Sequence, residues 1–197
     1  MLLSGLKNVI FCHLNREPDK FRDINTATLN CSVGIRLMLK LMEHEPIQPI
    51  SENLWWVIPG KLAGVRKPIA EELPELQAAG AQAIVSVMDY PSNLDLYQKA
   101  NIPYLWLPIK GGTTPSQEQL QDLQNFVDNQ NNFGNGVAIH CTNGRRRTGT
   151  MLASYLICTG SSYKDAIQTI GRANPEIELR EAQQNFLQEL EQRKQLT

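Results

Sequence analysis

Residues 140–149 bring together the residue types that phosphoryl transfer to sulfur requires. The run reads HCTNGRRRTG, with Cys141 six positions before Arg147. A cysteine thiolate is a strong nucleophile, and Gly144 and Gly149 let the backbone curl so that successive amides point at one anion. The planar guanidinium of an arginine can bind two phosphate oxygens at once. The run therefore predicts a phosphate cradle in which Cys141 attacks phosphorus.

The neighbouring side chains have expected roles in the same chemistry. Thr148 can donate its hydroxyl to the cysteine sulfur, which helps the thiolate to leave when a phosphocysteine is hydrolysed. His140 is expected to orient the loop through backbone hydrogen bonds rather than to act as a base. The residues expected to bind the substrate phosphate are Thr142, Asn143, Gly144, Arg145, Arg146 and Arg147.

A strand must deliver the cysteine to this loop, and a helix must begin beneath it. Residues 136–140 are mostly apolar, and an apolar helical pattern over residues 148–158 follows the loop and ends before Gly160. The positive end of that helix would stabilise a bound anion and a thiolate. Further strands are predicted over residues 54–58, 61–64, 83–88 and 104–108.

These strands alternate with helical patterns, which favours an α/β fold. The helices are predicted over residues 70–79, over 92–100 with Ser92 and Asp95 at its start, and from Thr114 as the N-cap residue. Two more begin near Ser162 and after residue 175. The prediction is a central, mainly parallel sheet of about five strands flanked by helices.

The first fifty residues have a different pattern. Apolar residues recur at helical spacing, which predicts a helix over about residues 26–42. We therefore divide the chain into an N-terminal helical extension, residues 1–50, and a catalytic domain, residues 51–197.

Composition excludes several classes of protein. Nineteen basic and twenty acidic residues leave a net charge of −1, so no overall field attracts nucleic acid or an anionic membrane, and neither is expected as a partner. No apolar run reaches the length of about 20 residues that spans a bilayer. The four cysteines lack metal-ligand spacing, which favours free thiols in the cytoplasm and a site without metal or cofactor.

The motif His-Cys-x5-Arg-Thr-Gly resembles the active-site signature of the protein tyrosine and dual-specificity phosphatases. Residues 56–64, WVIPGKLAG, resemble the opening strand pair of the small atypical dual-specificity enzymes, and the resemblance covers roughly residues 54–190. It implies a phosphatase fold and hydrolysis of phosphomonoesters through a phosphocysteine intermediate.

One element of the family pattern is missing. Family members usually carry a general acid, an aspartate, in a loop that here reads LPIKGGTTP over residues 107–115, and Ile109 stands at the expected position after Pro108. Asp89, after the third predicted strand, is our candidate for a substitute acid, with Glu178 as the second choice. Without an acid, phenolates and phosphates leave more readily than serine or threonine alkoxides. We therefore expect a preference for aryl phosphates or anhydrides.

Several substrates stay open at this point. Protein phosphotyrosine is the first expectation, followed by phosphoinositides or inositol phosphates and by RNA 5′-triphosphate. Arg145 and Arg146 either are solvated or bind a second anionic group of the substrate, with Lys110 as a helper. A non-catalytic phosphate-binding module is the alternative from another class.

Overall fold

The computed structural model of the protein describes residues 48–196. The predicted helix over residues 26–42 and almost all of the predicted N-terminal extension lie outside the described residues. The chain divides into two units between Ile47 and Gln48, and the second unit is described here. Ile50, assigned to the extension by the sequence, is fully buried against Val65 and Leu76 of the second unit.

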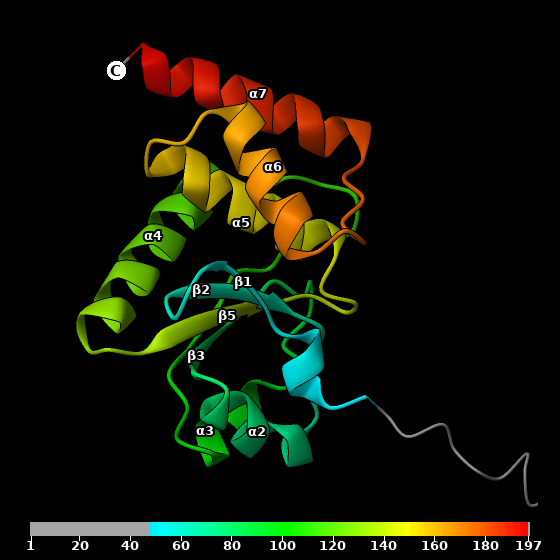
Figure 1. The fold of residues 1–197 in the computed structure, drawn as a ribbon, viewed down its shortest axis with the longest axis vertical. Helices are drawn as coiled ribbons and strands as arrows, with labels where there is room; N and C mark the ends of the chain where they lie inside the picture. The colour runs from blue at the N-terminus through cyan, green and yellow to red at the C-terminus, as the bar shows by residue number, and fades with distance from the viewer. Residues whose placement is uncertain (1–47, 197) are drawn as a thin grey trace, which may run out of the picture. The chain divides into compact units, whose positions relative to one another are not determined.

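Within residues 48–196, one sheet of five strands runs through the centre (Figure 1). Its spatial order is β1-β2-β5-β3-β4. The first two strands are antiparallel and all other neighbours are parallel, so the sheet is mainly parallel, as the sequence predicted. The strands are β1 Trp55–Ile58, β2 Leu62–Val65, β3 Ala81–Ser86, β4 Tyr104–Trp106 and β5 Gly136–His140.

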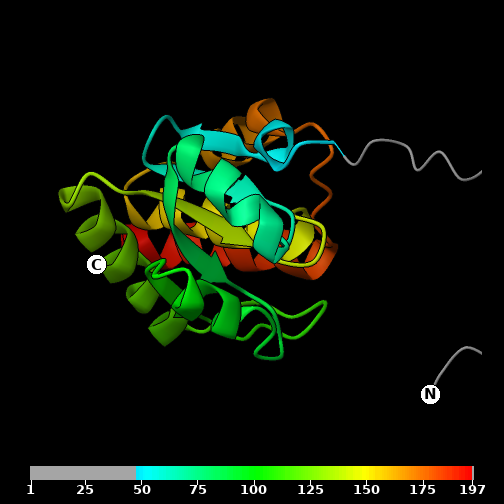
Figure 2. The same ribbon diagram turned by 90° about the horizontal axis from the view of Figure 1, so that it is seen from below.

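Helices cover both faces of the sheet (Figures 1 and 2). On one face lie α4 Gln117–Asn132, α5 Arg146–Cys158, α6 Tyr163–Ala173 and α7 Glu181–Gln195. On the other lie α2 Leu73–Ala78 and α3 Leu94–Lys99, and two short 3-10 turns, η1 Ile50–Asn53 and η2 Ala70–Glu72, complete the set.

Alternation along the strands divides the core between these two layers. Val85 of β3 and Ile139 of β5 belong to the large cluster that includes α4 to α7. Ile84 of β3 points to the opposite face, where it packs with Leu73 and the fully buried Tyr97. The central strands β3 and β5 are therefore covered on both sides, and the carboxyl end of β5 is held in place.

Several local predictions need correction. The long helix α4 begins after Ser116, whose hydroxyl accepts a hydrogen bond from the amide of Gln119, so Thr114 is not its cap. The cap of α3 is Asn93 in the left-handed region, at φ 70°, and not Ser92. Asn93 instead uses its side-chain amide to bind the carbonyl of Pro68. Both predicted N-cap residues are wrong by one or two positions. In each case several neighbouring polar residues could have served as the N-cap.

Candidate active site

The phosphate loop connects β5 to α5. His140 is the last residue of β5, and α5 begins at Arg146, two residues earlier than the sequence predicted. Gly144 turns the loop at φ +66°, and a Cβ on it would lie 2.5 Å from the carbonyl oxygen of Val65. Only glycine fits there, because the conformation and the space both exclude a side chain.

Cys141 lies at the base of this loop with 5% of its surface exposed. Burial alone raises the pKa of its thiol, but hydrogen bonds from the Thr148 hydroxyl and from the amides of Thr148, Arg145 and Asn143 outweigh burial. The pKa of Cys141 is therefore lowered, which favours the nucleophilic thiolate.

Thr148 lies in the first turn of α5, near the predicted nucleophile. Its hydroxyl is buried and has no hydrogen-bond partner among the described residues. A buried hydroxyl without such a partner is uncommon, since an unmade hydrogen bond costs stability. It nevertheless contributes to the lowered pKa of the Cys141 thiol, so the two side chains lie near each other.

His140 supports the loop from below and is neutral. Burial lowers the pKa of His140 to about 4, so its ring is neutral at physiological pH. A ring that is this weakly basic and fully enclosed does not act as the catalytic base. Its Nδ1 lies 3.3 Å from the carbonyl oxygen of Cys141, and its Nε2 lies 2.8 Å from the hydroxyl of Tyr97. Because a carbonyl only accepts, Nδ1 carries the proton and Nε2 accepts from Tyr97.

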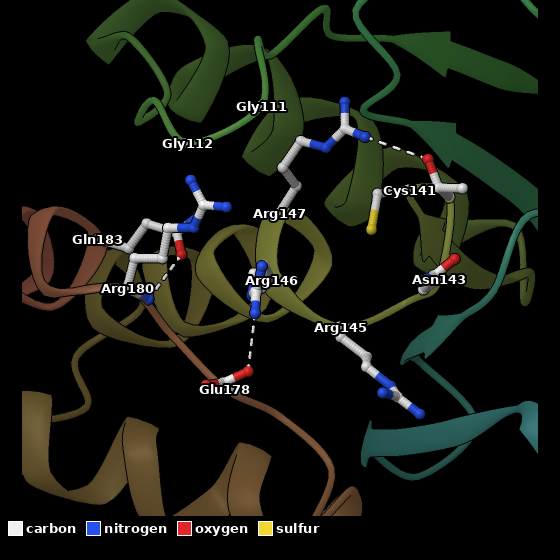
Figure 3. A pocket seen from close by; sticks show the side chains of 11 residues that line it. Gly111, Gly112, Cys141, Asn143, Arg145, Arg146, Arg147, Glu178, Arg180 and Gln183 are labelled. Atoms are coloured by element: carbon white, nitrogen blue, oxygen red, sulfur yellow. Dashed lines mark hydrogen bonds and ion pairs between the residues drawn. The ribbon is translucent and has the colours of Figure 1, made fainter.

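Arg147 is held by several acceptors at the rim. Its guanidinium donates to the carbonyl of Ile109 at 3.0 Å, to Asp89 Oδ1 at 3.2 Å and to Thr142 Oγ1 at 3.2 Å. These contacts orient the guanidinium above the loop, on the same side as Cys141 (Figure 3). The predicted pair of nucleophile and phosphate-binding arginine is thus brought together.

A pocket of about 390 Å³ opens over the cysteine (Figure 3). Three segments form its wall: the phosphate loop, the loop after β4 and the segment that leads into α7. The lining residues are Gly111, Gly112, Cys141, Thr142, Asn143, Arg145, Arg146, Arg147, Glu178, Arg180 and Gln183.

The two further arginines of the loop are paired with carboxylates. Arg145 contacts Glu176 at 2.5 Å, and Arg146 contacts Glu178 at 2.8 Å. All four side chains are about half exposed or more, so each pair contributes little to stability and can open when a stronger anion arrives. Lys110, the expected helper, is not among the lining residues.

The loop that should supply the acid faces the pocket with glycines. Ile109 is 2% exposed and packs in the main core, so that position turns away from the substrate. The residues that line the pocket are Gly111 and Gly112. The part of this loop that lines the pocket therefore carries no acidic side chain.

Neither candidate for a substitute acid has a favourable environment. Asp89 does not line the pocket, and its Oδ1 lies 3.2 Å from Nη1 of Arg147. Glu178 does line the pocket, but its hydrogen bond with Arg146 lowers its pKa, with smaller contributions from Arg180 and Arg145. A lowered pKa keeps the carboxylate ionised, whereas a general acid must carry a proton.

Sequence reasoning missed three residues of the site: Tyr97, Arg180 and Gln183. A signal for the second exists in the segment Glu176-Ile177-Glu178-Leu179-Arg180, where charged and apolar residues alternate with period two. Such alternation places the charged side chains on one side of an extended segment. Ile177 and Leu179 pack against the main core beside α5, which leaves the charged residues facing the phosphate loop.

Comparison with known proteins agrees with this fold. A family model described as "Polymorphic toxin system, DSP-PTPase phosphatase" matches residues 60–161. Protein tyrosine phosphatase type IVA 3 of Bos taurus is 24% identical over 135 residues, which cover 68% of this chain and 77% of that protein. The chain spans less than two thirds of the next curated relatives that it matches, from 18% to 59% of their length.

Solved structures repeat the same architecture. Tk-PTP in its active form is 30% identical, with a TM-score of 0.64 over 72% of this chain and 97% of that one. Human DUSP28 is 22% identical, with a TM-score of 0.62 over 73% of this chain and 99% of that one, and shows the fold alone.

The family match and the fold define a cysteine-dependent phosphatase of the protein tyrosine and dual-specificity class. The chain belongs to the family of DSP-PTPase phosphatases of polymorphic toxin systems. Among residues 48–196, no helix has the length and apolarity to cross a membrane. The same residues contain no group of three His, Cys, Asp or Glu side chains arranged for a metal ion.

Proposed function

We propose that the protein hydrolyses aryl phosphate monoesters, with protein phosphotyrosine as the first substrate to test, and that Cys141 is the nucleophile. The lowered pKa of the thiol supports this proposal most directly, because only the thiolate attacks phosphorus efficiently. Its sulfur forms a bond to phosphorus while the bond from phosphorus to the ester oxygen breaks. The leaving phenolate takes the electron pair.

The transition state would be stabilised by the loop and by Arg147. The amides around Gly144 and the guanidinium of Arg147 surround the position of the transferred phosphoryl group, and α5 adds the positive end of its dipole. The proposed contacts of the phosphate are with Thr142, Asn143, Gly144, Arg145, Arg146 and Arg147. No step requires a metal ion or an organic cofactor.

Water would complete the cycle. Its oxygen attacks phosphorus, the bond between sulfur and phosphorus breaks, and the thiolate is regenerated while a proton passes to solvent. The Thr148 hydroxyl, donated to the sulfur, stabilises that thiolate as it leaves. Asp89 would act by holding Arg147 in place, which its 3.2 Å contact supports better than proton donation.

The location and the partners follow from the same chemistry. A catalytic thiolate must stay reduced, so we place the protein in the cytoplasm. Phosphorylated proteins or other phosphate esters are the expected partners, and neither a membrane nor nucleic acid is.

Single-turnover trapping tests the proposal. Wild-type protein mixed with a phosphotyrosine peptide should release a burst of dephosphorylated peptide and carry phosphate on Cys141, and Cys141→Ser should bind the peptide without a burst. A side-by-side comparison with phosphoserine peptide, inositol phosphate and RNA 5′-triphosphate ranks the substrates. Binding of all aryl phosphates without any release would mean that the protein is a phosphate-binding module.

A further inference from the structure

One arginine in the pocket has no carboxylate partner. Arg145, Arg146 and Arg147 each contact an acidic side chain at 2.5–3.2 Å. Arg180 also lines the pocket, and no ion pair joins it to any acidic residue among residues 48–196. Glu178 interacts with it only at longer range, so its guanidinium is the one in this wall that can bind an external anion without first breaking an ion pair.

Arg180 lies against the loop from which family members supply their acid. Its Nη1 is 2.8 Å from the place that a Cβ on Gly112 would occupy. Figure 3 shows the side chain of Arg180 rising beside Gly112, across the pocket from Asn143 and Arg145. A positive charge thus stands on the side of the pocket where the leaving group is expected.

Helix stability does not explain an arginine at this position. Arg180 is the N-cap residue of α7, where serine, threonine, aspartate and asparagine are strongly preferred. A cation at the positive end of a helix dipole is also unfavourable. The side-chain oxygen of Gln183 accepts a hydrogen bond from the Arg180 amide at 3.0 Å, and the guanidinium of Arg180 makes no capping hydrogen bond to α7.

We infer that Arg180 forms a subsite for a second phosphate carried by the leaving group, so that the enzyme also cleaves phosphoanhydrides; this inference rests on the proposed function. A phosphate that already carries one proton leaves as the dianion without help from an acid, which suits a loop that presents Gly111 and Gly112 instead of an acid. The fork of an arginine binds two phosphate oxygens, and exposure of this side chain leaves it accessible.

The cleavage balances without an acid. The Cys141 thiolate attacks the terminal phosphorus and forms a sulfur–phosphorus bond. The bond from that phosphorus to the bridging oxygen breaks, and the bridging oxygen leaves with the electron pair as part of a phosphate bound by Arg180. Water then hydrolyses the phosphocysteine as proposed for aryl esters.

The test compares inorganic pyrophosphate with phenyl phosphate in the presence of a chelator. The measured quantity is the ratio of kcat/KM for pyrophosphate to kcat/KM for phenyl phosphate. Arg180→Gln should lower this ratio about tenfold, the loss expected for one charge-assisted contact at an exposed site. Arg180→Lys should restore part of it, because a lysine keeps the charge but not the fork.

A matched control is Arg172→Gln, which removes an exposed arginine of α6 outside the pocket and should leave the ratio unchanged. If wild-type protein cleaves phenyl phosphate but not pyrophosphate, the inference fails. It also fails if Arg180→Gln leaves the ratio as it was. If the wild-type protein hydrolyses neither pyrophosphate nor phenyl phosphate, the proposed phosphatase function itself is refuted.

Discussion

Installing the missing acid is the most direct test of how the pocket works. Gly111 faces the pocket, its φ lies outside the left-handed region, and a Cβ on it would meet no atom within 4 Å. Gly111→Asp therefore adds a carboxyl group without backbone strain or collision. Gly112 is unsuitable, because its φ is +87° and its Cβ would press on Arg180.

The expected gain depends on the leaving group. A positioned acid contributes about 10²- to 10⁴-fold. With no neighbour within 4 Å to fix its rotamer, a new aspartate at residue 111 should reach at most the lower end, about 100-fold in kcat on a phosphoserine peptide. A phenolate with a pKa of about 10 needs less help, so phosphotyrosine turnover should rise less than about threefold.

Steady-state rates against pH provide the measurement. The variant should acquire a descending basic limb with phosphoserine peptide, because the new acid works only when protonated. Gly111→Asn is the isosteric control, and Lys110→Asp places the same carboxyl group one residue outside the pocket lining while also removing a positive charge. Equal rates for Gly111→Asp and Gly111→Asn would refute the view that the leaving group lies next to residue 111.

Four further outcomes are expected. Tyr97→Phe removes the donor to the buried Nε2 of His140 and should cost about 1–3 kcal/mol of unfolding free energy in urea. Folding lowers the pKa of His140 from 6.5 to about 4, so the unfolded state binds a proton there more readily than the folded state. The protein should therefore lose about 3 kcal/mol of unfolding free energy as the pH falls from 6.5 to 4. His140→Asn should flatten this pH dependence, measured by urea unfolding. Thr148→Val should raise the pKa of Cys141, so that alkylation by iodoacetamide shifts to higher pH, whereas Thr148→Ser should not. Asp89→Asn should lower kcat about tenfold on every substrate while the pH profile keeps its shape, as expected for the loss of a charged contact; a vanished basic limb would instead make Asp89 the acid.

The phosphate loop could be predicted because its determinants are local. The spacing from Cys141 to Arg147, the glycine that must turn and the strand and helix on either side are all contiguous in sequence. The sheet was also predictable, since β5 and β3 are apolar on both faces and parallel strands covered by helices have that composition.

Contacts between distant segments could not be predicted in the same way. Tyr97 and His140 are 43 positions apart in the sequence, yet their side chains form a hydrogen bond. The apolar pattern around Tyr97 predicts only that one face of its helix is buried, and not against which residue. The acid loop shows the limit more clearly. The sequence marks the position after Pro108, but the backbone leaves β4 so that Ile109 fills the core and Gly111 meets the pocket.

Charge pairing shifts the source of selectivity away from the phosphate loop itself. The sequence left open whether Arg145 and Arg146 are solvated or bind a second anionic group, and in the structure each forms an exposed ion pair, with Glu176 and with Glu178. The same extended segment then supplies Arg180, whose charge is not neutralised by any ion pair among residues 48–196. Because charged residues alternate with core residues there, an exchange of one charge alters the pocket without disturbing the core. Substrate choice can therefore change through residues 176–180 while Cys141 and its loop stay as they are.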